Sequence, residues 1–186
     1  MFQTCRIVMK AIQNNIAIIS MHTNLDNAPG GVNHKMAEKL GLENVRFLQP
    51  MNRGGYEGGS GVIGEISAAA PGVPFVEYVK AIFKAPSAQC TLPPVRESEG
   101  ILKIALCGGA GSFLLEDAKA QGADVFITGE MHYHEYFEAL GDIQIIVLGH
   151  YETEQFTCEL LQEILAKSCP ELPTRLFGST NPIVVK

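Results

Sequence analysis

Residues 101–167 carry the pattern that decides the fold: ILKIALCGGAGSFLLEDAKAQGADVFITGEMHYHEYFEALGDIQIIVLGHYETEQFTCELLQEILAK. Apolar runs at 101–107, 123–128 and 143–148 are each followed by a polar or glycine-rich loop and then by a segment with helical spacing. Strands with one solvent-exposed face alternate between apolar and polar residues, and these runs do not alternate. Continuous apolar runs are typical of parallel strands that are buried on both faces. We therefore predict an α/β protein with layered parallel or mixed sheets and helices on their faces.

The residues before 101 are less regular. Helices are predicted at 1–15, 33–40 and 74–83, and a strand at 16–22. The second of these helices has Asn33 as its predicted N-cap and Gly41 just beyond its end. Residues 49–61, QPMNRGGYEGGSG, are the richest in glycine and predict a flexible connector or an excursion at a strand edge.

Composition limits the class of protein. The 186 residues are 46% hydrophobic and 18% charged, which is typical of a folded globular chain. The net charge of −6 argues against a general nucleic-acid or anionic-membrane binder. No apolar run reaches the length of a membrane span. The five cysteines are odd in number and form no CxxC motif, so we predict a reduced, cytoplasmic protein.

Most of the chemically reactive side chains follow predicted strands. They are His22 and Asp26, the GGAGS loop at 108–112, Glu130 with His132 and His134, and His150 with Glu154. Loops after parallel strands meet at one edge of the sheet, where ligands bind in such folds. A mixture of imidazole and carboxylate donors suits Zn²⁺, Fe²⁺, Mn²⁺ or Ni²⁺ better than Ca²⁺. Because no GxSxG motif occurs, any hydrolysis is predicted to depend on metal-activated water.

His150 and Glu154 are four residues apart at the start of the last predicted helix, so they share one helix face. Projected back from the apolar stripe that begins at Phe156, both side chains lean toward the interior. A carboxylate and an imidazole in that position must be compensated. They can pair with each other, cap the helix, or share a cation.

The other features have ordinary alternatives. Taken alone, His22 and Asp26 more often stabilise a turn by hydrogen bonds than bind a metal. The GGAGS loop resembles a phosphate cradle, yet it lacks the P-loop lysine and also fits a tight strand-to-helix turn. The loop that contains Glu130 and His134 can be a solvated polar loop, or its side chains can line a pocket and shuttle protons.

Three longer blocks resemble a known family. HTNLDNAPGGVN at 22–33, ITGEMHYHE at 127–135 and GHYETE at 149–154 are similar to the signature blocks of the NIF-three-like family, whose members are commonly named GTP cyclohydrolase type-two homologues. The resemblance runs through most of the chain and extends to the closing NPIVV at 181–185.

The resemblance implies two similar lobes with a dinuclear metal centre in the cleft between them, and assembly into a hexameric ring. By matching positions it implies Asp26, His150 and Glu154 as metal ligands, with His22 beside the site. On this basis residues 1–48 are the remainder of the first lobe, 49–61 the connector where relatives carry an inserted domain, and 62–186 the second lobe of one compact unit.

The match departs from the family in one respect that bears on function. Family members carry a paired-histidine motif that supplies further ligands, and this chain has no His-His dipeptide. We therefore expect a truncated or naturally short chain that binds metal weakly or partially and self-associates through bare apolar surface.

Two functions follow from these observations. One is a metal-dependent hydrolase of a nucleotide or related heterocycle. The other is a non-catalytic, ring-forming metal-binding scaffold or regulatory protein.

Overall fold

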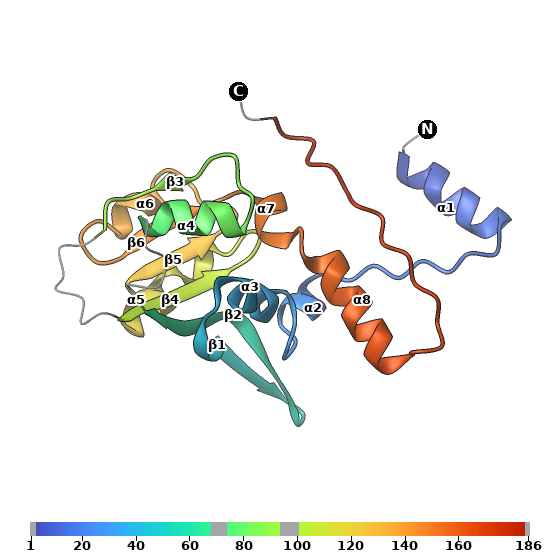
Figure 1. Ribbon diagram of the computed structural model, residues 1–186, viewed down its shortest axis with the longest axis horizontal. Helices are drawn as coiled ribbons and strands as arrows, with labels where there is room; N and C mark the ends of the chain where they lie inside the picture. The colour runs from blue at the N-terminus through green and yellow to red at the C-terminus, as the bar shows by residue number, and fades with distance from the viewer. Residues whose placement is uncertain (1–2, 68–73, 94–100, 185–186) are drawn as a thin grey trace.

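The fold, described from a computed structural model, is built around one mixed sheet (Figure 1). The structure describes residues 3–67, 74–93 and 101–184. Its helices are α1 (Gln3–Gln13), α2 (Thr23–Asp26), α3 (Val32–Leu40), α4 (Phe75–Ile82), the 3-10 turn η1 (Ser112–Leu114), α5 (Leu115–Ala120), α6 (Glu135–Glu138), α7 (His150–Glu154) and α8 (Thr157–Ser168). Its strands are β1 (Glu43–Arg53), β2 (Tyr56–Ser67), β3 (Gln89–Cys90), β4 (Ile101–Cys107), β5 (Val125–Thr128) and β6 (Gln144–Val147).

The six strands lie in the order β1-β2-β4-β5-β6-β3. The central strands β4, β5 and β6 are parallel, with Ile104 opposite Val125 and Val125 opposite Gln144. The flanking strands β1, β2 and β3 pair antiparallel to their neighbours. The prediction of parallel strands in the three apolar runs is therefore confirmed, and the sheet as a whole is mixed.

The parallel strands are buried on both faces, as their continuous apolar sequence indicates. Along β4, Ile104 packs on one face with α3 and α4, whereas Ala105 packs on the other face with α5. Phe126 of β5 also belongs to the α5 face and is fully buried. Helices therefore cover both faces of the parallel strands, and the loops at the carboxyl ends of these strands lie between the two helical layers.

The last predicted helix is divided in two. His150–Glu154 forms α7, and α8 begins only at Thr157, whose hydroxyl donates to the Glu154 carbonyl at 2.7 Å. The break turns Phe156 against Phe83, with ring centroids 5.8 Å apart. The apolar stripe of α8 therefore does not continue into α7, and the His150 side chain is 47% exposed instead of leaning into the core.

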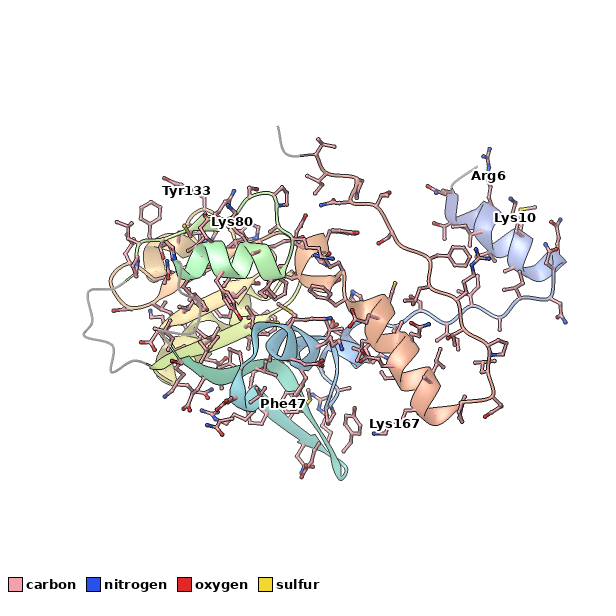
Figure 2. The ribbon with its side chains drawn as sticks, viewed as in Figure 1. Arg6, Lys10, Phe47, Lys80, Tyr133 and Lys167 are labelled. Carbon is pink, nitrogen blue, oxygen red and sulfur yellow. The ribbon has the colours of Figure 1, made fainter. Side chains whose placement is uncertain are left out.

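Residues 16–22, predicted as a strand, are irregular and exposed. Ile16 and Ile19 are 59% and 84% exposed. A strand needs a hydrogen-bonding neighbour, and within the described residues none lies alongside this segment. The segment leads to α1, which lies apart from the sheet and carries Arg6 and Lys10 away from it (Figures 1 and 2).

The glycine-rich stretch 49–61, predicted as a flexible connector or an excursion at a strand edge, forms the outer part of the paired β1–β2 hairpin. Gly54 and Gly55 make the two-residue turn with φ of 60° and 84°, a conformation that favours glycine. The hairpin also joins residues on both sides of the predicted lobe boundary into one sheet. The division into two lobes remains a prediction.

Within the described ranges, no helix is both long enough and apolar enough to cross a membrane.

Candidate metal centre

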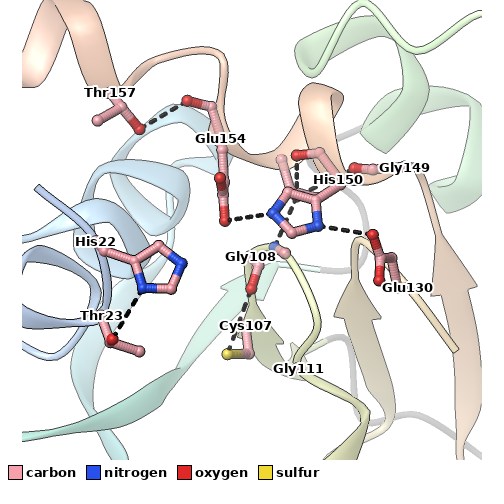
Figure 3. Close-up of polar contacts among 12 residues, drawn as sticks. His22, Thr23, Cys107, Gly108, Gly111, Glu130, Gly149, His150, Glu154 and Thr157 are labelled. Atoms are coloured by element: carbon pink, nitrogen blue, oxygen red, sulfur yellow. Dashed lines mark hydrogen bonds and ion pairs between the residues drawn. The ribbon is translucent and has the colours of Figure 1, made fainter. Parts of the chain in front are cut away.

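The candidate site lies where β4, β5 and β6 end. The loops after these strands carry Gly108 and Gly109, Glu130, and His150, and the α2 turn that carries Asp26 lies opposite them. Figure 3 shows the Glu154 carboxylate between the rings of His22 and His150 in that view.

His150 is held by two carboxylates. Its Nδ1 donates to Glu130 Oε1 at 2.7 Å, and its Nε2 lies 3.2 Å from Glu154 Oε1 (Figure 3). Burial lowers the pKa of His150, but the hydrogen bond to Glu130 and the negative charges of Glu154 and Glu130 outweigh burial, and the pKa is raised overall. When Nδ1 carries the proton of a neutral imidazole, the Nε2 lone pair faces a carboxylate oxygen. That contact is favourable only with a proton or another cation between the two atoms.

The two predicted carboxylate ligands share one electrostatic environment. Burial raises the pKa of Asp26, and the charges of His22 and His150 partly offset this. Burial also raises the pKa of Glu154, which Asp26 raises further while His150 and His22 lower it. Burial therefore disfavours the charged form of both carboxyl groups, a cost that a bound cation would offset.

Cys107 lies beneath the site. Burial raises the pKa of its thiol to about 12, and the nearby carboxylates of Asp26 and Glu154 add to the rise. Both carboxylates therefore lie close to the same buried thiol, although 128 residues separate them in sequence. Cys107 was not singled out from the sequence, where a lone cysteine after a strand carries no signal of its own.

The remaining predicted site residues differ in their placement. His22 is exposed, its Nδ1 hydrogen-bonds Thr23 Oγ1 at 3.2 Å, and its ring lies close enough to Asp26 and Glu154 to influence their pKa values. Glu130 orients His150. The ring of His134 stacks on His132 at 5.8 Å, and none of its described contacts reaches His150 or Glu154.

In the part of the chain that the structure describes, no three His, Cys, Asp or Glu side chains are gathered closely enough to hold a metal ion as they stand. His150 Nε2 and Glu154 Oε1 lie 3.2 Å apart, and Asp26 is close enough to Glu154 to raise its pKa.

Three of the five amides in the GGAGS loop donate to protein acceptors. The amides of Gly108, Gly109 and Gly111 donate to Asn33 Oδ1, Thr153 Oγ1 and Thr128 Oγ1 at 2.9, 3.0 and 3.1 Å. These three amides are therefore not free to bind a phosphate, and the loop makes a tight turn between β4 and η1. Gly109 has φ +61°, and a Cβ there would collide with Glu154 Oε1 and lie 3.1 Å from His150 Nε2.

Two cavities flank His150. One, of about 300 Å³, lies toward Glu130 and Gln89, and the other, of about 440 Å³, lies toward Glu154 and Cys158. The C-terminal segment walls both, held by the Tyr151 hydroxyl on Ser179 O at 2.7 Å and by Asn181 Nδ2 on Glu152 Oε1 at 2.8 Å. A small molecule can therefore approach His150 from either side of α7.

Fold and site together define a mixed α/β protein with a histidine–carboxylate cluster at the carboxyl edge of its parallel strands. The chain belongs to the Duf34/NIF3 (NGG1p interacting factor 3) family, whose profile matches residues 2–182.

Relatives and solved structures agree with this assignment. The chain is 32% identical to the GTP cyclohydrolase 1 type 2 homolog of Streptococcus pneumoniae serotype 4 over 95% of this chain and 68% of the relative. It is 32% identical to the homolog of the same name from Clostridium acetobutylicum over 96% of this chain and 64% of the relative. This chain therefore spans about two thirds of the length of these relatives.

Two solved structures share the fold. A Bacillus cereus protein related to NIF3 superposes with a TM-score of 0.74 at 22% identity, covering 97% of this chain and 77% of that one. A Staphylococcus aureus hypothetical protein gives 0.68 at 27% identity, covering 87% of this chain and 64% of that one.

Proposed function

We propose that this chain binds a divalent metal ion through Asp26, His150 and Glu154, and that the site serves a hydrolase acting on a nucleotide or related heterocycle. The observation that carries the proposal is the contact between His150 Nε2 and Glu154 Oε1 at 3.2 Å, with Nδ1 committed to Glu130. Two donors about 2.1 Å from one ion lie roughly 3.0–3.4 Å apart at right or tetrahedral angles, so the observed separation suits two ligands of one ion.

Each residue has a distinct part in this proposal. Glu130 keeps the proton of His150 on Nδ1 and so presents the Nε2 lone pair to the ion, a common arrangement around metal-binding histidines. Asp26 and Glu154 supply negative charge, and burial, which raises the pKa of both, would be offset by the cation. His22 stays beside the site, with its Nδ1 hydrogen-bonded to Thr23 Oγ1.

A divalent ion supplies Lewis acidity, which activates water and polarises an electrophilic ring carbon. The substrate class rests on the relatives named GTP cyclohydrolase 1 type 2 homolog. The two cavities beside His150 are of a size that admits a small heterocycle.

The test is metal binding by metal-free protein, measured by isothermal titration with Zn²⁺, Mn²⁺ and Ni²⁺. We expect His150→Ala and Glu154→Gln each to weaken binding by at least about tenfold, whereas His132→Ala, which changes a surface histidine, leaves it unchanged. Equal binding by all four proteins would place the metal elsewhere. Loss of GTP, followed by ion-exchange chromatography with and without metal, tests the substrate class separately.

A second function, a self-associating scaffold, is favoured by the exposed apolar surface at the N-terminal end. Helix α1 exposes Ile7 and Ile12 at 53% and 75%, and the segment after it exposes Ile19 at 84%. Apolar side chains gathered in this way mark association surfaces. Sedimentation velocity over a concentration series distinguishes the cases: a scaffold associates with or without metal and turns over no substrate. A monomer at all concentrations would remove this alternative.

A further inference from the structure

A buried chain of hydrogen bonds connects the two halves of the candidate site. It begins at the carbonyl of Asp26, which accepts from Asn33 Nδ2 at 3.1 Å. The same Asn33 side chain accepts at Oδ1 from the Gly108 amide at 2.9 Å. Asn33 is 1% exposed, so its amide group has no alternative partner in solvent.

The chain continues through the glycine loop to α7. The Gly109 amide donates to Thr153 Oγ1 at 3.0 Å, and that hydroxyl lies 3.0 Å from the carbonyl of His150, to which it can donate. The Gly109 carbonyl accepts from the Gly129 amide at 3.0 Å, next to Glu130. Thr153 is fully buried. The adjacent residues Gly108 and Gly109 thus connect the turn of Asp26 with the loop of Glu130 and the helix of His150.

We propose that Asn33 and Thr153 are positioning residues that fix Asp26 relative to His150 and so set the affinity of the metal site. This rests on the proposed metal-binding function. Both side chains bond backbone groups and not the proposed ligand side chains. Asn33 holds the backbone of a ligand from the α2 turn, and Thr153 holds the backbone of a ligand from α7, both against the same rigid loop. Ligands borne on separate elements must be held within a fraction of an ångström for tight binding.

The ordinary alternative is that both side chains only satisfy buried backbone groups. In that case, substituting Asn33 or Thr153 lowers the free energy of unfolding but does not weaken metal binding more than any other equally destabilising substitution does. The two roles therefore separate when metal affinity is compared between variants of similar stability.

The experiment uses the full chain and five proteins. Asn33→Ala removes both of its bonds, Thr153→Val removes the hydroxyl while keeping the volume, and Thr153→Ser restores the hydroxyl. Ala118→Gly, at a fully buried position on α5 on the other face of the sheet, is the control for lost stability. We expect Asn33→Ala and Thr153→Val to raise the Zn²⁺ dissociation constant about 10–100-fold, and Thr153→Ser and Ala118→Gly to match the wild type.

A metal-free readout accompanies the titration: amide hydrogen exchange at two glycines, followed by NMR. We expect Asn33→Ala to deprotect the Gly108 amide and Thr153→Val to deprotect the Gly109 amide, with neither effect in Ala118→Gly. If the wild type binds Zn²⁺ and the bridge variants bind it equally well, the positioning role is wrong. If the wild type binds no metal, the proposed function fails, and amide exchange alone decides whether the bridge exists.

Discussion

Removing the charge of Glu130 is the most informative single perturbation of the site. Glu130 Oε1 accepts from His150 Nδ1 at 2.7 Å, and the two side chains are 57% and 47% exposed. Because water screens such a pair, its loss should change stability by only about 0.2–1 kcal/mol. Its effect on metal binding should be larger, because the bond selects the His150 tautomer that leaves Nε2 free.

Substitution of a residue that hydrogen-bonds a metal-binding histidine typically weakens metal affinity about 10–100-fold. Because Glu130 and His150 are both exposed, we expect an effect near the lower end of that range. We therefore expect Glu130→Gln to raise the Zn²⁺ dissociation constant about tenfold, which corresponds to about 1.4 kcal/mol. Glu130→Ala, which also removes the hydrogen-bond acceptor, should weaken binding further. The pKa of His150 should fall in both variants, because Glu130 is among the groups that raise it.

The assay is isothermal titration with Zn²⁺ at constant pH, with the His150 pKa followed by NMR in the metal-free protein. Glu138→Gln on α6 is the matched control, since it removes the same charge from an exposed position. Equal dissociation constants for Glu130→Gln and Glu138→Gln would refute the reasoning, because net charge alone would then explain any change.

Three further predictions concern stability and association. Burial lowers the pKa of His34 below its ordinary value of 6.5, so in acid the unfolded state binds more protons than the folded state. The free energy of unfolding should therefore decrease as the pH falls below about 6.5. His34→Leu should flatten this pH dependence, measured by urea titration. The Lys35 side chain is 4% exposed and forms a 2.8 Å ion pair with Glu163, which holds α3 against α8. Lys35→Met should lower the free energy of unfolding by about 1–2 kcal/mol in the same assay. An unchanged free energy of unfolding would show that the pair is only a surface contact. Ile12→Glu should reduce self-association in sedimentation velocity, and an unchanged profile would show that α1 is not part of the contact.

The parallel core was predictable because its signal is local. Each strand is a continuous apolar run, and each loop after it contains glycine, so neither depends on distant parts of the chain. The start of α7 was predictable for the same reason, since four-residue spacing places His150 and Glu154 on one helix face.

The sequence predictions that were wrong concern segments whose structure depends on residues far away in the chain. Residues 16–22 have strand composition, but pairing requires a neighbour that composition cannot reveal. Asn33 was predicted as a helix cap, whereas Gly31 caps α3 and Asn33 bridges to Gly108, which is 75 residues away. The hairpin was missed even though Gly54 and Gly55 provide the local signal for a two-residue turn, because the strands around it are too rich in glycine to alternate.

The most direct test of the central claim is the position of a bound ion. Crystals of the full chain grown with Mn²⁺ or Zn²⁺, with anomalous diffraction recorded at the metal edge, would locate it without reference to activity. The account predicts one anomalous peak within about 2.0–2.2 Å of His150 Nε2 and of carboxylate oxygens from Asp26 and Glu154. A peak at other residues, or an intact His150–Glu154 contact with no peak at saturating metal, would contradict it.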